Sequence, residues 1–223
     1  MTARLYQFAT SPFCAKVRKI LDYKGVDYEA VEVDYLQRGE LLVASGQIMV
    51  PALTFESGET IVDSARITAR LEELFPNPTV FPPSWRGLHL AMARYIDSEI
   101  EDAAFRVALS DELEHYRMRG ADRLALFRLI RERKYGAGFC DRMVAERDAN
   151  LARLSDLLAP FDEALADRAF LFGRIGYADF ALYSQLHLLE LTGESRLPPE
   201  FKNLREFHGR VDRITSALGD NAG

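Results

Sequence analysis

The sequence predicts an α/β N-terminal domain built on a four-stranded mixed sheet, followed by an all-α helical bundle. Short β-like runs alternate with helical runs up to about residue 80, and beyond that point the pattern is helical almost to the C-terminus. Prolines typical of a linker gather where the pattern changes, at Pro76, Pro78, Pro82 and Pro83. We therefore place the two domains at residues 1–78 and 84–220.

The N-terminal domain begins with a β-α-β pattern. Residues 4–8 are rich in aromatic and apolar side chains and predict a strand. Ser11 is a favoured N-cap, Pro12 occupies the first helical position, and Gly25 is a natural stop for the helix. Residues 28–34 alternate between apolar and charged side chains, which predicts a second strand.

The rest of this domain predicts a β-hairpin and a helix. Residues 52–55 and 60–62 flank a short polar segment that contains Gly58, as in a hairpin. A helix follows from about Ser64 and ends before Pro76. Residues 36–48 give no clear signal. A β-α-β unit and a terminal hairpin together form a mixed sheet of four strands.

The second domain predicts a bundle of helices. A long helix runs from Trp85 to about residue 109, and further helices are expected over residues 121–134, 139–165, 177–191 and 201–216. The segment 177–191 is apolar around most of its circumference, which predicts a buried helix at the centre of the bundle.

Composition narrows the class of protein. The formal net charge of -6 provides no field to attract nucleic acid or anionic lipid. The N-terminus does not resemble a signal peptide, and no apolar run approaches the roughly 18 residues of a membrane span. Two cysteines and four scattered histidines form neither a disulfide framework nor a zinc pattern. We expect a cytoplasmic protein with no metal, no nucleic-acid partner and no membrane attachment.

Chemistry is expected first at the junction between the first strand and the first helix. This junction has the sequence Ser11-Pro12-Phe13-Cys14. A helix N-terminus carries free N–H groups and about half a positive charge, so a side chain there can stabilise an anion. Ser11 offers a hydroxyl donor at this position, and Cys14 offers a thiol.

Four motifs carry a resemblance to a known family. Ser11-Pro12-Phe13-Cys14, with Lys16-Val17-Arg18 after it, resembles the active-site turn of serine-type, bacterial-like glutathione S-transferases. It also resembles the Cys-Pro-x-Cys turn of glutaredoxins, with Ser11 in place of the first cysteine. Three further motifs are similar to elements of the transferase family. Val50-Pro51-Ala52-Leu53 resembles its Val-Pro-x-Leu element, whose proline is cis, and Asp63-Ser64 resembles its acidic-Ser pair. The segment 173–179 resembles the Gly-x-x-x-Ser/Thr-x-Ala-Asp element of its second domain.

The resemblance implies a thioredoxin-like N-terminal domain and a function. The protein would conjugate the thiol of glutathione, its co-substrate, to an electrophilic, hydrophobic small molecule, as in detoxification, and it would be a homodimer. The backbone of Val50, before Pro51, would pair with the cysteinyl part of glutathione. Ser64 would hold the γ-glutamyl carboxylate and Asp63 the ammonium. Phe13 and Tyr95 would line the site of the electrophile.

Ser11 is the expected catalytic residue. A free thiol has a pKa of about 8.5, so making it mostly thiolate at neutral pH requires about 2.7 kcal/mol. A hydrogen bond from a hydroxyl to a charged sulfur contributes about 1.5–3 kcal/mol, and a helix N-terminus about 0.3–1 kcal/mol. These two contributions suffice without a metal or a general base.

The sequence departs from the family pattern at the residue expected to contact the C-terminal glycine of glutathione. The family often has a basic residue just before Val-Pro that contacts the glycyl carboxylate, and here this residue is Met49. The loss of this charge should weaken glutathione binding, or else Gln47 or Lys16 takes over the contact. A second departure is Gly176, which replaces the Ser or Thr that caps a helix in the second domain.

Two other functions stay open at this stage. Cys14 is the alternative catalytic residue, in a thiol oxidoreductase that forms a mixed disulfide with glutathione. Its ordinary interpretation is a small buried apolar residue. The other open function is that of a non-enzymatic binding protein that kept the transferase fold.

Overall fold

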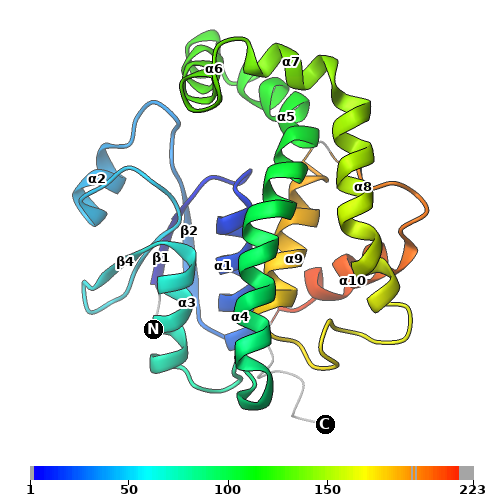
Figure 1. Cartoon of the computed structure of the whole chain (residues 1–223). Helices are drawn as coiled ribbons and strands as arrows, with labels where there is room; N and C mark the ends of the chain where they lie inside the picture. The colour runs from blue at the N-terminus through cyan, green and yellow to red at the C-terminus, as the bar shows by residue number, and fades with distance from the viewer. Residues whose placement is uncertain (1–2, 192, 194, 216–223) are drawn as a thin grey trace.

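The computed structural model describes residues 3–191, 193 and 195–215. Its N-terminal part is a four-stranded sheet with three helices, and its C-terminal part is a helical bundle beside it (Figure 1). The elements of the N-terminal part are β1 (Ala3–Gln7), α1 (Pro12–Lys24), β2 (Tyr28–Glu32), α2 (Gly39–Ser45), β3 (Ala52–Thr54), β4 (Thr60–Val62) and α3 (Ser64–Leu74). The predicted fold class, a mixed sheet with helices and then a helical domain, is confirmed.

The sheet has the strand order β2-β1-β3-β4. β1 and β2 are parallel, whereas β3 lies antiparallel to both β1 and β4. Alternate residues of β1 point to opposite faces of the sheet, as the period of two requires. Leu5 belongs to the large core shared with α1, α3 and the bundle, and Tyr6 belongs to a smaller cluster that includes Leu41 of α2. Tyr6 is therefore a packing residue, with 3% of its surface exposed.

The bundle differs from the predicted helices at several helix ends, including the last helix, predicted over 201–216, which ends at Asp212; residue 216 lies outside the described residues. Two differences are larger. Its elements are η1 (Pro83–Trp85), α4 (Arg86–Tyr95), the π-helical turn η2 (Ile96–Ile100), α5 (Glu101–Arg117), α6 (Ala121–Tyr135), α7 (Phe139–Ala145), α8 (Arg147–Ala164), α9 (Tyr177–Leu188) and α10 (Lys202–Asp212). The long helix continues past residue 109 because Asp111, which interrupts the apolar pattern, is buried in a bidentate ion pair with Arg196 at 2.9 Å. The helix predicted over residues 139–165 is two helices, since Glu146 leaves helical geometry between α7 and α8.

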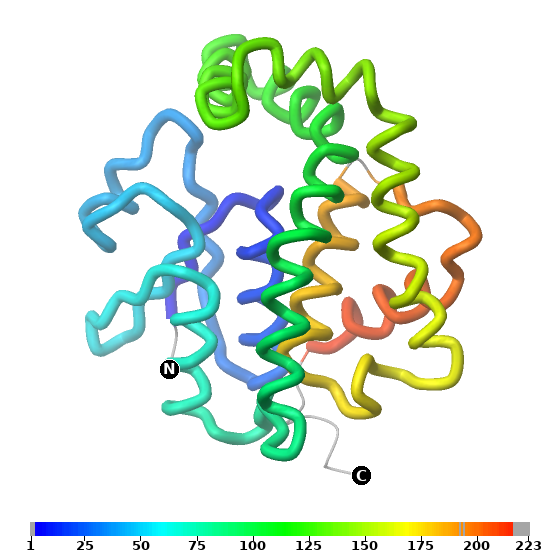
Figure 2. Tube along the Cα trace, in the orientation of Figure 1, coloured from blue at the N-terminus to red at the C-terminus, as the bar shows by residue number. Residues whose placement is uncertain are grey.

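The bundle and the sheet domain meet along α9. This helix packs against both α1 and α4, and Figure 2 shows it alongside the long helix formed by α4, η2 and α5. Its residues are buried around almost the whole circumference, which confirms the prediction of a central helix. The backbone N–H of Tyr177 also donates to the carbonyl of Val80 at 2.8 Å, so the linker is tied to the start of α9.

The N-terminus of α9 is capped by a residue from another helix. Asp179 accepts from the N–H groups of Leu171 at 2.8 Å and Gly176 at 2.9 Å. Gly176 has no side chain to cap the helix, and the ring of His89 from α4 fills its place. His89 is fully buried and its Nδ1 accepts from the N–H of Ala178 at 3.3 Å. A Cβ at position 176 would overlap the His89 ring, which explains the glycine in this motif.

This arrangement predicts that His89 and Gly176 are energetically coupled. Gly176→Ser alone should lower the free energy of unfolding by about 1–3 kcal/mol, because the added atoms overpack the site. In the His89→Ala background the same substitution should be neutral or slightly stabilising, since serine then has room to act as the N-cap. Denaturant unfolding of the wild type, both single variants and the double variant measures the coupling. Equal effects of Gly176→Ser in both backgrounds would show that His89 does not replace the cap.

Candidate functional site

Three segments of the predicted site leave the sheet at the same end. Tyr6 pairs with Ala52, and Ala52 pairs with Val62. The residues after β1, those before β3 and those after β4 are therefore neighbours. The N–H of Asp63 donates to the carbonyl of Pro51 at 3.3 Å, which joins two of these segments directly. Strand register thus brings the loop of Ser11, the Val50–Pro51 segment and the Asp63–Ser64 segment together.

Ser11 caps α1, as its sequence position predicts. Its Oγ accepts from the N–H of Cys14 at 3.4 Å, and its carbonyl accepts from the N–H of Ala15 at 3.0 Å. Pro12 has no N–H, so only the N–H of Phe13 in this first turn has no partner among the described residues. The half-buried hydroxyl of Ser11 and this helix N-terminus lie side by side, and both stabilise negative charge.

Cys14 lies one turn inside α1 and is fully buried. Burial raises the pKa of its thiol to about 11, against the opposing effect of the nearby Ser11 hydroxyl. A reactive cysteine needs an accessible thiolate, which a lowered pKa provides. Cys14 is buried and the pKa of its thiol is raised, so its placement favours a packing role over a role in an oxidoreductase.

The segment before β3 has an accessible backbone. The Val50–Pro51 peptide bond is cis. No described group takes up the N–H or the C=O of Val50, so both remain open to an added strand. The side chain of Met49 is 68% exposed beside them. A short extended peptide could therefore pair with this backbone from the solvent side.

Asp63 and Ser64 begin α3. The Oδ1 atom of Asp63 accepts from the N–H groups of Ala65 and Arg66, both at 3.0 Å, which leaves Oδ2 without a protein partner among the described residues. Asp63 has a φ of 79°, a conformation that a residue other than glycine rarely adopts and that clusters at functional sites. The hydroxyl of Ser64 makes no hydrogen bond within the described chain.

Neither of the two predicted substitutes for a basic residue at position 49 is free. The side-chain amide of Gln47 is folded onto its own loop: its nitrogen donates to the carbonyl of Met49 at 2.8 Å, and its oxygen accepts from the N–H of Met49 in a short contact. Lys16 is fully buried, and its Nζ lies 2.5 Å from Oδ2 of Asp97. The expectation that Gln47 or Lys16 contacts the glycyl carboxylate is therefore not supported, because both groups are already engaged.

The ion pair of Lys16 and Asp97 was not predicted from the sequence. Asp97 lies on η2, and π-helical turns are often found at functional sites. The Nζ of Lys16 also lies 5.2 Å from the ring centroids of Phe13 and Tyr177. Burial lowers the pKa of Lys16, and Asp97 opposes this effect. A lysine at this helical position looks like a solvated residue, and no sequence signal marks its partner 81 positions away.

The two residues predicted to line the electrophile site, Phe13 and Tyr95, lie in different surroundings. Phe13 lies at the start of α1 under the ammonium of Lys16. Tyr95 instead stacks near Phe161 and lines a separate apolar groove of about 530 Å³ between α4 and α8. A cavity of about 170 Å³ lies closer to Ser11 and is lined by Thr10 and by residues at the α5–α6 corner, such as Tyr116 and Arg119. Sequence periodicity alone does not distinguish these faces.

The fold is a thioredoxin-like domain joined to a helical bundle, and the unpaired backbone of Val50 lies at the end of the sheet where α1 begins. The sequence profile of the glutathione S-transferase N-terminal domain matches residues 5–79, and that of the C-terminal domain matches residues 144–210. The chain belongs to the glutathione S-transferase family.

Curated relatives match this chain in part. A probable glutathione S-transferase from Nicotiana tabacum is 34% identical over 101 residues, which are 44% of this chain and 45% of that protein. Glutathione S-transferase U4 from Arabidopsis thaliana is 26% identical over 129 residues, 56% of this chain and 57% of that protein. The chain spans about half the length of these two relatives.

Solved structures match over nearly the whole chain. A glutathione S-transferase from Rhodospirillum rubrum has a TM-score of 0.73 at 24% identity, with 95% of this chain and 88% of that chain covered. A glutathione S-transferase of Ceriporiopsis subvermispora, in complex with glutathione, has a TM-score of 0.69 at 18% identity, with 95% and 97% covered. At these identities the likeness shows a shared fold.

Two further observations concern the described part of the chain alone. None of its helices has both the length and the apolar character needed to cross a membrane. It also contains no group of three or more His, Cys, Asp or Glu side chains arranged to hold a metal ion.

The environment of Cys14 predicts an unreactive thiol. With a pKa of about 11, only about one thiol in a thousand is ionised at pH 8. Native protein incubated with oxidised glutathione should therefore form no adduct on Cys14, whereas unfolded protein should react readily. Mass spectrometry of peptides from both samples measures this difference. Rapid formation of the adduct in the native protein would instead support an oxidoreductase.

Proposed function

We propose that this protein is a glutathione S-transferase that conjugates the thiol of glutathione to an electrophilic, hydrophobic small molecule. The observation that carries the proposal is the convergence of the Ser11 loop, the open backbone of Val50 and the Asp63–Ser64 segment at one end of the sheet. Each segment offers a group that complements a different part of the tripeptide.

The cysteinyl part of glutathione would pair with the N–H and C=O of Val50, as an added strand pairs with a sheet edge. The γ-glutamyl carboxylate would accept hydrogen bonds from the hydroxyl and N–H of Ser64 at the start of α3. The free Oδ2 of Asp63 would face the ammonium of the same residue. The segment joined by the Asp63–Pro51 hydrogen bond would thus bind both ends of the γ-glutamyl–cysteine unit.

The sulfur of glutathione would then lie near the hydroxyl of Ser11. The hydroxyl would donate to the thiolate, and the N-terminus of α1 would add a favourable electrostatic contribution. The bound thiolate would attack an electrophile held near the cavity that Thr10 and Tyr116 line, and the leaving group of the electrophile would depart to solvent. The alternative chemistry at Cys14 receives no support from its burial.

Two further features belong to the same proposal. We infer a cytoplasmic homodimer that acts in detoxification, which rests on the family resemblance and on no contact described above. Sedimentation of the purified protein would measure its mass in solution.

The role of Ser11 predicts a loss of turnover. Ser11→Ala should lower kcat with a chloronitrobenzene electrophile by about 10-fold to 100-fold at pH 7, because the thiolate loses a charge-assisted hydrogen bond of about 1.5–3 kcal/mol. Affinity for glutathione should change little. The deficit should shrink as the pH rises above about 8.5, where the thiol ionises without help.

Cys14→Ala is the matched control for this experiment, since it changes the other candidate in the same turn and should retain most of the turnover. Unchanged turnover in Ser11→Ala would remove Ser11 as the activating group. Tight binding of glutathione without turnover of any electrophile in the wild type would favour a non-enzymatic binding protein.

A further inference from the structure

The cavity near Ser11 has walls of opposite charge. Glu32 and Asp34, at the end of β2, lie on the side of the sheet. Arg119 and Arg123, where α5 ends and α6 begins, lie on the side of the bundle. The partners of these four groups determine which kind of ligand the cavity can bind.

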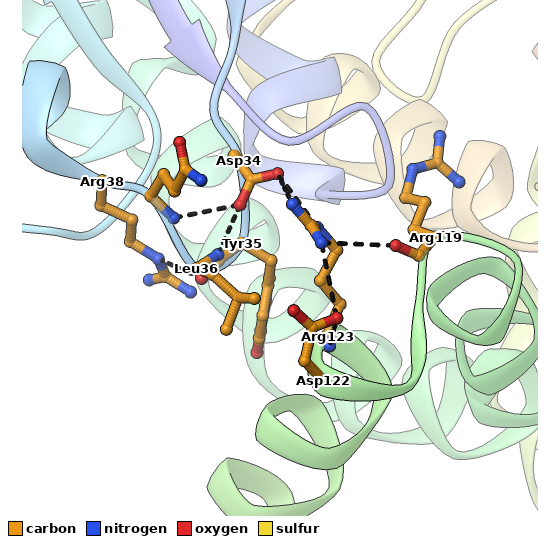
Figure 3. A network of polar contacts seen from close by, with 8 residues as sticks. Asp34, Tyr35, Leu36, Arg38, Arg119, Asp122 and Arg123 are labelled. Atoms are coloured by element: carbon orange, nitrogen blue, oxygen red, sulfur yellow. Dashed lines mark hydrogen bonds and ion pairs between the residues drawn. The ribbon is translucent and has the colours of Figure 1, made fainter.

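Three of the four groups are engaged within the chain. Nη2 of Arg123 lies 2.6 Å from Oδ2 of Asp34, so these two charges neutralise each other across the domains (Figure 3). The carboxylate of Glu32 accepts from the N–H of Ala9 at 2.9 Å and from the side-chain amide of Gln7 at 3.2 Å. Glu32 therefore keeps its negative charge and is held against the end of β1.

Arg119 has no carboxylate partner among the described residues. Its Nη1 donates to Nδ1 of His115 at 3.0 Å and to the carbonyl of His115 at 3.2 Å. A guanidinium has no acceptor, so Nδ1 must be the acceptor, which requires an unprotonated Nδ1. Burial and the charge of Arg119 both lower the pKa of His115, which favours this neutral ring. The ring thus orients Arg119 and leaves its charge uncompensated.

The free side of Arg119 matches an acidic group. Its Nε and Nη2 donate to no described residue, and adjacent donors of a guanidinium form a fork that fits a carboxylate. Figure 3 shows the guanidinium apart from the pair of Asp34 and Arg123. The side chain is exposed, so a ligand can reach it.

Three aromatic rings line the same cavity and contact one another. The ring centroids of Phe8 and Tyr35 are 5.4 Å apart, and those of Tyr35 and Tyr116 are 4.6 Å apart. Aromatic rings favour packing at such distances, so a planar aromatic ligand has suitable partners here. Thr10, which directly precedes Ser11, lines the cavity as well.

We propose that this cavity binds aromatic electrophiles that carry an acidic group, and that Arg119 binds this group. The proposal rests on the proposed function, because it names the class of the second substrate. The negative charge of Glu32 disfavours an acid on the sheet side, so the acid faces Arg119 and the reacting carbon faces Thr10 and Ser11. Arg119 determines specificity and takes no part in ionisation of the thiol.

The test compares two electrophiles that differ only in charge, a chlorodinitrobenzoate and the corresponding chlorodinitrobenzamide. In each reaction the thiolate of glutathione forms a C–S bond at the carbon that bears chlorine, the C–Cl bond breaks, and chloride and the proton of the thiol go to solvent. Each kcat/KM is divided by the rate constant of the same reaction without enzyme. Wild-type protein should prefer the benzoate about 10-fold, as expected for a charge-assisted hydrogen bond.

Arg119→Gln should reduce this preference to about twofold or less. The loss should appear as a higher KM for the benzoate with kcat nearly unchanged, because Arg119 contacts a group that does not react. Turnover of the benzamide should stay at the wild-type value, which also shows that the variant is folded.

Arg117→Gln is the matched control. It removes one positive charge from the same end of α5, at an exposed arginine that pairs with Glu114 at 2.9 Å. This variant should keep the preference of the wild type. An equal reduction of the preference in both variants would show a general charge effect and would overturn the assignment of Arg119.

The remaining outcomes separate this proposal from the proposed function. An unchanged preference in Arg119→Gln, or an equal loss of turnover with both electrophiles, would overturn the role of Arg119. Wild-type turnover of a neutral chloronitrobenzene without any preference for the benzoate would overturn the proposed substrate class alone. Absence of turnover with all three electrophiles would overturn the proposed function itself.

Discussion

The buried ion pair between Lys16 and Asp97 is the constraint on which the arrangement of the site depends. The ammonium of Lys16 is fully buried, and a buried charge without a partner is strongly unfavourable. Helix α1 must therefore present this side chain to η2 at 2.5 Å, which fixes the rotation and height of α1 against the bundle. Ser11 lies little more than one turn before Lys16, so its position relative to the second domain is fixed as well.

A second buried lysine acts at the other end of the same helix. Lys24 lies 2.5 Å from Glu72 of α3 and donates to the carbonyls of Phe75 at 2.7 Å and Pro78 at 2.9 Å. One helix is thus tied to the bundle near its N-terminus and to α3 and the linker at its C-terminus. The proposed glutathione site is built on this frame, and the contacts proposed for the ligand come mostly from backbone groups and short side chains. Such groups lose little conformational entropy on binding.

Local signals in the sequence predicted most of the fold and part of the site. Ser11 and Gly25 bound the first helix because an N-cap and a left-handed C-cap depend on neighbouring residues only. The hairpin, the start of α3 and the central position of α9 are likewise local or periodic patterns. The sheet register then joins the three predicted segments, because adjacent strands share their ends.

Contacts between distant segments could not be predicted in this way. His89 replaces a cap that Gly176 cannot provide, and Arg38 reaches the loop before Val50 across ten residues. The length of α5 was underestimated because Asp111 is paired with a residue 85 positions away. In each case the sequence gives no sign that the polar side chain differs from an exposed surface residue. Only tertiary packing gives that side chain a specific partner.

The central claim is that this frame holds Ser11 where it ionises the thiol of bound glutathione. The most direct measurement is the pH titration of the thiolate absorbance of glutathione bound to the wild-type protein. We predict an apparent pKa for the bound thiol about two units below the value of about 8.5 for a free thiol. A bound thiol that titrates at the value of the free thiol would contradict it.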